Sequence, residues 1–173
     1  MGSMKTSKRE KERSSLMHVG RRVDYAVRAL AYLAAQPSGK IISKAEIQKS
    51  QDIPFHFLSK IMRNLVVRGI VNSRRGTKGG FRLAKQAAMI TIRDVYEAVE
   101  GPLSVMNCVV HGDTYCWFSS VCAQISVWER ARSLLASYLA TVSIADIADR
   151  EGLRRRLSRL QSRRSFILQD KIP

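Results

Sequence analysis

The sequence predicts a mainly α-helical protein with a small β-wing: a winged helix-turn-helix followed by a long dimerisation helix. Apolar residues recur at helical spacing in three successive segments between residues 20 and 69. The pattern then changes to two short strand-like segments joined by the glycine-rich stretch RRGTKGG. A further apolar stripe covers about residues 122–142, and it predicts a helix that is long for a small domain.

The first helix is expected to run from Gly20 to about Gln36, because Pro37-Ser38-Gly39 stops helical structure. Its apolar residues return once per turn at Val23, Val27, Leu30 and Ala31.

The second and third helices form the predicted helix-turn-helix pair. Ser43 is expected to cap the second helix, with Glu46 completing a capping box, and this helix should end near Asp52. Pro54 suits the first turn of the third helix, and Gly69 should end it. The apolar residues of the third helix are Phe57, Leu58, Ile61, Met62 and Leu65.

The remaining elements follow in order. Strands at 70–71 and 81–83 are expected to form a hairpin, and Thr91 should cap a short helix that ends at Gly101-Pro102. Cys122 is expected at the start of the long helix, and Ser143 at the start of one further turn. The apolar stripe of the long helix consists of Ile125, Trp128, Leu135, Leu139 and Val142.

Composition favours a polyanionic partner. The 173 residues carry a net charge of +16, of which residues 1–22 contribute +5 and residues 150–173 contribute +6. Basic ends of this kind favour DNA, with binding that weakens as salt increases.

The sequence contains no long apolar run and no signal-peptide pattern, so a cytoplasmic protein without a membrane segment is expected. It also lacks a nucleophile–His–acid pattern, a phosphate loop and a cofactor fingerprint, so neither an enzyme nor a small-molecule substrate is predicted.

All three cysteines lie within one 15-residue segment, CVVHGDTYCWFSSVC, as Cys108, Cys116 and Cys122. Clustered thiolates are soft ligands that suit iron–sulfur clusters and zinc. Three is one short of the usual four, so the fourth ligand must be another residue type, another subunit or a small molecule. Trp117 and Phe118 are expected to shield the sulfur atoms.

The winged helix predicts which residues meet DNA, since the second helix of the pair enters the major groove and the wing lies beside it. The candidates on the third helix are Ser59, Lys60 and Arg63. Those on the wing are Arg74, Arg75, Lys78 and Arg82.

Together these segments resemble a known family. VDYAVRALAYLA, the stretch from SKAEIQKSQ to GGFRLAK, the three-cysteine loop and the long helix are similar to the Rrf-two (BadM-type) transcriptional regulators, over roughly residues 17–150. The resemblance implies a homodimeric regulator that binds double-stranded operator DNA. It further implies the iron–sulfur type, similar to IscR, NsrR and RirA, in which a cluster senses iron, redox state or nitric oxide.

The resemblance also implies ligands. Cys108, Cys116 and Cys122, spaced as in RirA-like members, would hold a 2Fe–2S or 4Fe–4S cluster. IscR-like members use a histidine three residues after the third cysteine, where this chain has Ile125. NsrR-like members use an acidic residue in the first helix of the other subunit, and Asp24 matches that position. Asp24 is therefore the candidate fourth ligand.

Other interpretations of the same residues stay open. An aspartate in a first helical turn is also favoured by the helix dipole, which would explain Asp24 without a metal. His111 is a second candidate ligand, and with the three cysteines it could form a structural zinc site. The thiols could also act as a metal-free redox switch.

The predicted organisation has five parts. They are a flexible basic arm (1–19), a winged helix-turn-helix DNA-binding domain (20–101), a cluster-binding cysteine loop (102–122), dimerisation helices (123–149) and a basic C-terminal tail (150–173).

Overall fold

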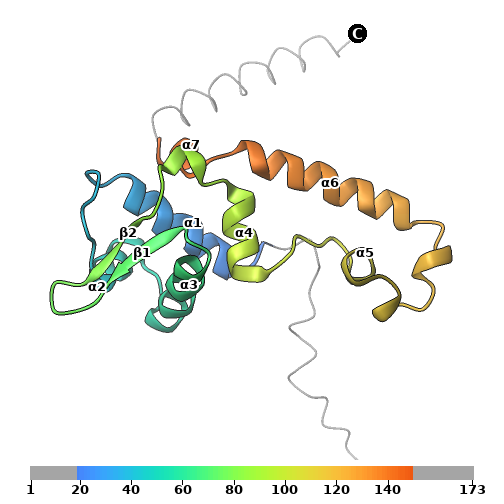
Figure 1. The fold of residues 1–173 in the computed structure, drawn as a ribbon, viewed down its shortest axis with the longest axis horizontal. Coiled ribbons are helices and arrows are strands. Elements are labelled where there is room, and N and C mark those ends of the chain that lie inside the picture. Colours follow the sequence, from blue (N-terminus) through green and yellow to red (C-terminus); the bar gives the residue numbers. More distant parts are fainter. Residues whose placement is uncertain (1–18, 150–173) are drawn as a thin grey trace, which may run out of the picture.

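The computed structural model describes residues 19–149 and shows an elongated molecule (Figure 1). The predicted basic arm, apart from Val19, and the predicted basic tail lie outside the described residues. The helices are α1 (Arg21–Ala34), α2 (Lys44–Gln51), α3 (Phe55–Val67), α4 (Ile92–Glu100), α5 (Asn107–His111), α6 (Ile125–Thr141) and α7 (Ile144–Ala148). The strands are β1 (Val71–Arg74) and β2 (Gly80–Leu83), and short 3₁₀ turns are η2 (Ala87–Met89), η3 (Gly112–Thr114) and η4 (Ser119–Val121).

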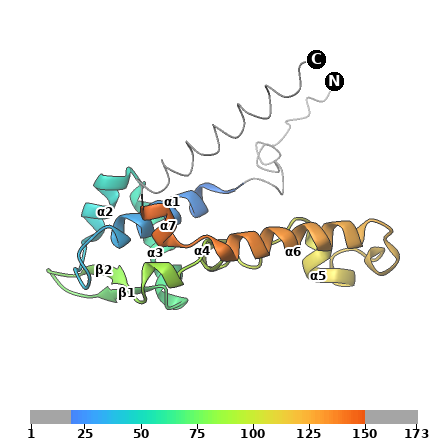
Figure 2. The same cartoon turned by 90° about the horizontal axis from the view of Figure 1, so that it is seen from above.

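The predicted winged helix-turn-helix is confirmed. Helices α1, α2 and α3 precede an antiparallel hairpin in which Val71 pairs with Leu83 and Arg74 pairs with Gly80. We call these elements together (residues 21–83) the winged body. The winged body fills one end of the molecule, while α5 and the turns after it lie at the other end (Figure 2). Helix α6 joins the two ends.

The helix caps follow local side-chain chemistry. The Ser43 hydroxyl accepts a hydrogen bond from the Glu46 backbone N–H at 3.1 Å, as predicted. The Glu46 carboxylate accepts instead from the Tyr32 hydroxyl at 3.1 Å, so this side chain ties α2 to α1. Asp52 ends α2 in the left-handed conformation, with φ of 49°.

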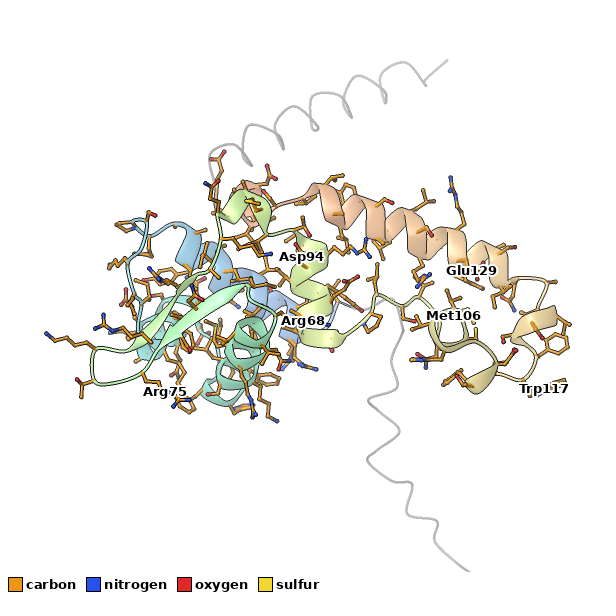
Figure 3. The ribbon with its side chains drawn as sticks, in the orientation of Figure 1. Arg68, Arg75, Asp94, Met106, Trp117 and Glu129 are labelled. Carbon is orange, nitrogen blue, oxygen red and sulfur yellow. The ribbon has the colours of Figure 1, made fainter. Side chains whose placement is uncertain are left out.

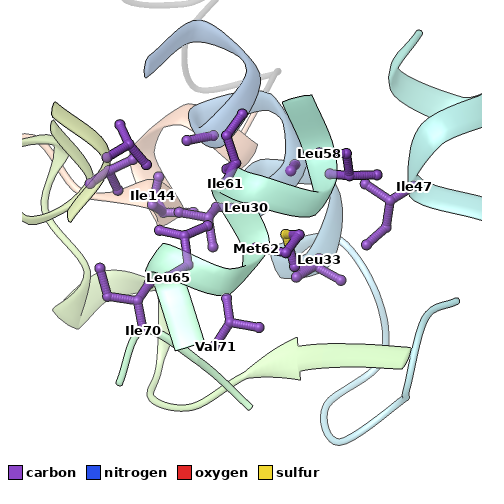
Figure 4. Close-up of a cluster of buried hydrophobic side chains, with 14 of the residues drawn as sticks. Leu30, Leu33, Ile47, Leu58, Ile61, Met62, Leu65, Ile70, Val71 and Ile144 are labelled. Carbon is purple, nitrogen blue, oxygen red and sulfur yellow. The ribbon is translucent and has the colours of Figure 1, made fainter. Parts of the chain in front are cut away.

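The core forms around α1, which packs against α2, α3, α4, α7 and β2. Its inward face is fully buried at Leu30, and α3 contributes Leu58, Ile61 and Leu65 to the same cluster (Figure 4). Burying each such side chain contributes about 1.5–3 kcal/mol. One cluster therefore fixes α3 relative to every other element of the winged body.

A short bridge joins the wing to the segment between α1 and α2, in addition to the burial of Val71 in the core. Ile42, between α1 and α2, exchanges backbone hydrogen bonds of 2.9 and 2.8 Å with Phe81 of β2. Gly80 makes this approach possible, since a Cβ atom there would lie 2.2 Å from the Ile42 carbonyl oxygen.

The segment between α4 and α7 leaves the winged body and returns to it. Capping boxes at Thr91 and Ser143 begin α4 and α7, and these two residues form an isolated β-bridge. Ile144 is fully buried beside α1, so the returning chain ends in the core. The two ends of the excursion are thus tied at one point.

Helix α6 is shorter than predicted. Residues 119–121 form the turn η4 and Cys122 has an extended backbone, so the helix begins at Ile125 instead of Cys122. Its 17 residues span about 26 Å at the usual rise of an α-helix. None of them is fully buried, and apolar side chains such as Leu134 and Tyr138 are exposed.

Among residues 19–149, no helix is long and apolar enough to cross a bilayer.

We expect Gly80→Ala to destabilise the protein by about 1–3 kcal/mol, because the new methyl group collides with fixed backbone. Urea unfolding followed by circular dichroism measures this change. Gly20→Ala is the matched control, since its φ of −63° suits alanine and its Cβ would meet only the Glu100 side chain. Equal stability of the two variants would contradict the role of Gly80.

Candidate nucleic-acid interface and cysteine loop

A basic groove of about 430 Å³ lies between α3 and the wing. We call it the α3–wing groove. The predicted DNA contacts Ser59, Arg63, Arg74 and Arg75 all line it. The wing glycines Gly76 and Gly79 line it as well, so backbone is accessible at its edge. Four of the seven predicted contacts are therefore brought together by the fold.

The other three predicted contacts do not line this groove. Lys60 is exposed on α3 and Lys78 is exposed near the tip of the wing. Arg82 pairs with Asn72 across the hairpin and lines a second hollow together with Arg74, because Asn72 and Arg74, two residues apart on β1, share one face of the wing. The roles of Lys60, Lys78 and Arg82 in DNA binding stay predictions.

Sequence reasoning missed Lys44, the first residue of α2, which also lines the groove. Its Nζ atom donates to the Ser59 hydroxyl at 3.2 Å and lies 3.9 Å from the centre of the Phe55 ring. The signal in the sequence was a lysine in a first helical turn, where the helix dipole disfavours a cation.

The groove is uniformly positive. No acidic residue lines it, and its cations have no carboxylate partner within residues 19–149. Three ion pairs among the described residues lie elsewhere, on α1 and α4: Arg22–Glu100, Arg28–Asp24 and Arg93–Glu97. Unpaired cations around one groove create a local positive potential that attracts phosphate.

The cysteine loop lies at the far end of the molecule, and Trp117 at its tip is remote from Arg75 on the wing (Figure 3). Cys108 is in α5, while Cys116 and Cys122 flank the turn η4. All three thiols are half-buried and form no disulfide. Two internal hydrogen bonds brace the loop, from the Ser119 hydroxyl to the Asp113 carboxylate and from the Thr114 hydroxyl to the His111 carbonyl.

Within residues 19–149, no three Cys, His, Asp or Glu side chains lie close enough together to hold a metal ion. His111 is exposed at the end of α5. Asp24 lies on α1 of the winged body, 56% exposed and 3.6 Å from Arg28. The set Cys108, Cys116, Cys122 and Asp24 is not assembled within one chain, and the ligand assignment stays a prediction.

Trp117 and Phe118, which are expected to shield the sulfur atoms, are both exposed, and their shielding role stays a prediction. Trp117 is 84% exposed and stacks edge-on against Phe118 at 5.3 Å between ring centres. Tyr115 and Val121 are also exposed beside them. The loop therefore presents an apolar surface at its tip.

Comparison with known proteins identifies the family. The family model described as "Rrf2: Iron-dependent Transcriptional regulator" matches residues 19–150. The HTH-type transcriptional regulators MT1325 and Rv1287 of Mycobacterium tuberculosis are each 33% identical over 132 residues, covering 76% of this chain and 81% of the relative.

Solved structures share the fold. CymR, the global cysteine regulator of B. subtilis, superposes with a TM-score of 0.61 at 23% identity, covering 76% of this chain and 96% of that chain. IscR of T. potens gives a TM-score of 0.59 at 24% identity, covering 76% and 85%. With the family match and the M. tuberculosis relatives, the conclusion is that this chain belongs to the Rrf2 family and is a DNA-binding transcriptional regulator, not an enzyme.

Proposed function

We propose that this regulator binds its operator as a homodimer and that an iron–sulfur cluster, sensing iron, redox state or nitric oxide, controls the binding. The observation that carries the proposal is the segregation of the two sites. Unpaired cations gather at the winged end, and all three thiols gather in one braced loop at the other end.

The α3–wing groove supports DNA binding through α3 and the wing. A winged helix places α3 in the major groove and the hairpin over the adjacent backbone. Arg63 would then meet base edges or phosphates, while Arg74 and Arg75 neutralise phosphates beside them.

The donor chemistry of the loop fits a cluster. Three half-buried thiols on one 15-residue segment provide soft ligands, and Ser119, almost fully buried, fixes the turn between Cys116 and Cys122. When bound, a cluster would supply a redox-active, oxidant-sensitive iron centre.

A fourth ligand from a second copy would agree with the position of Asp24. Its carboxylate is exposed on α1 and forms no metal-binding group with the cysteines of its own chain within residues 19–149. We therefore assign the fourth position to Asp24 of the partner subunit. The exposed apolar side chains of α6 (Val127, Leu134, Leu135 and Tyr138) provide the surface for pairing.

This assignment would connect the cluster to the DNA-binding helix α3 through contacts of α1. Asp24 pairs with Arg28, and the neighbouring Tyr25 ring packs edge-on against Phe57 of α3 at 5.5 Å. Ligation by Asp24 would remove its carboxylate from Arg28 and bias the position of α1 under α3. Such a bias shifts the population between dimers that bind DNA and dimers that do not.

We expect Arg75→Gln to lower the slope of log affinity against log salt by about 0.9, the value for one phosphate contact. Fluorescence anisotropy with a duplex selected by the wild-type protein from a random library provides the measurement. Arg130→Gln on exposed α6 is the control, and its slope should equal that of the wild type. Equal slopes for all three proteins would remove Arg75 from the interface.

We expect Cys116→Ala to abolish visible absorbance and bound iron and sulfide in anaerobically purified protein, and to uncouple DNA binding from iron supply. Ser120→Ala, exposed in the same loop, should behave as the wild type. A wild-type protein with zinc or no metal would contradict the cluster. A variant that still responds to chelator or oxidant would contradict the role of Cys116.

We expect Leu134→Glu to convert a dimer into a monomer, because it places a charge within the exposed apolar face of α6. Sedimentation velocity gives the mass directly. Ser126→Glu adds the same charge in the first turn of α6, away from that face, and should leave the dimer intact. A monomeric wild type, or a dimeric Leu134→Glu variant, would exclude pairing through this face.

A further inference from the structure

The stability of α2 does not explain a lysine at position 44. It is the first residue of α2, where the partial positive charge of the helix end opposes a cation. Yet its ammonium group is held by two contacts to α3: the Ser59 hydroxyl at 3.2 Å and the Phe55 ring at 3.9 Å. Both contacts restrict the direction of a normally flexible side chain.

Ser59 is already committed in its hydrogen bonding. Its hydroxyl donates to the Phe55 carbonyl oxygen at 2.9 Å and accepts from Lys44. A serine hydroxyl has a single proton, so Ser59 has none left to donate to a base or a phosphate. Lys44 uses one of three N–H donors in this contact, which leaves two for a ligand.

Phe55 is 55% exposed at the start of α3, although large apolar side chains usually pack inside. Its contact with Lys44 gives the exposed ring a role as a platform for the ammonium group. The same ammonium shares the α3–wing groove with Arg63, Arg74 and Arg75, and no carboxylate of residues 19–149 neutralises it.

We propose that Lys44 contacts a DNA phosphate at the α3–wing groove, and that Ser59 is a positioning residue acting through Lys44. The inference rests on the proposed DNA binding through α3 and the wing. It transfers the role expected of Ser59 to a residue of the preceding helix. An aligned lysine binds phosphate as a point charge and fixes the register of α3 on the duplex.

The test is a double-mutant cycle of Lys44→Met and Ser59→Ala, read by anisotropy on the library-selected duplex over a range of salt concentrations. We expect Lys44→Met to lower the salt slope by about 0.9, as for one lost phosphate contact. Lys44→Arg should keep the slope. Ser59→Ala should weaken binding in the wild-type background and have no effect in the Lys44→Met background, while Ser59→Thr, which keeps the hydroxyl, should bind as the wild type.

Three results would overturn this inference. An unchanged salt slope in Lys44→Met would remove the phosphate contact. An equal loss from Ser59→Ala in both backgrounds would mean that Ser59 meets DNA itself. A wild-type protein that selects no duplex would overturn the proposed function as well, which distinguishes that failure from the first two. Circular dichroism melting, together with Lys44→Gln as a second neutral variant, separates these effects from misfolding.

Discussion

Burial of the inward face of α1 is the constraint on which the remaining structure depends. Leu30 is fully enclosed, and α1 is the one element that touches α2, α3, α4, α7 and β2 together within the described residues. Protein interiors are close-packed, so a shift of α1 must be matched by its neighbours. The recognition helix α3 and Ile144 of α7 therefore belong to one core cluster.

That shared core explains how two distant sites can belong to one mechanism. The winged end is positioned by α1 through α3, and the excursion toward the cysteine loop begins at α4 and ends at α7, both packed on α1. Neither the cysteine loop nor α6 contributes a buried residue to the core cluster of the described residues. The segment that carries the cysteine loop meets the winged body at the tie of Thr91 and Ser143 and where α6 packs on α4.

Local signals predicted most of the fold, because they act over a few residues. Ser43, Thr91 and Ser143 cap helices as expected. The change from helical to strand-like spacing of apolar residues after Gly69 correctly predicted the wing. The start of α6 was misplaced because Cys122 belongs to a turn pattern that has no strong sequence signature. Lys44 could not be assigned to the groove, since its place depends on how α2 crosses α3, 15 residues further along the chain.

The tie between Thr91 and Ser143 also makes α6 a lever. One end of the helix is held at the core beside α7, and the other carries the cysteine loop about 26 Å away. A rotation of about 10° at the held end displaces the loop by roughly 4–5 Å over that length. By the same geometry, a displacement of a few ångströms at the loop reaches the winged body as a small change of angle. In the dimer that we propose, such a change would alter the spacing of the two winged bodies while each stays folded.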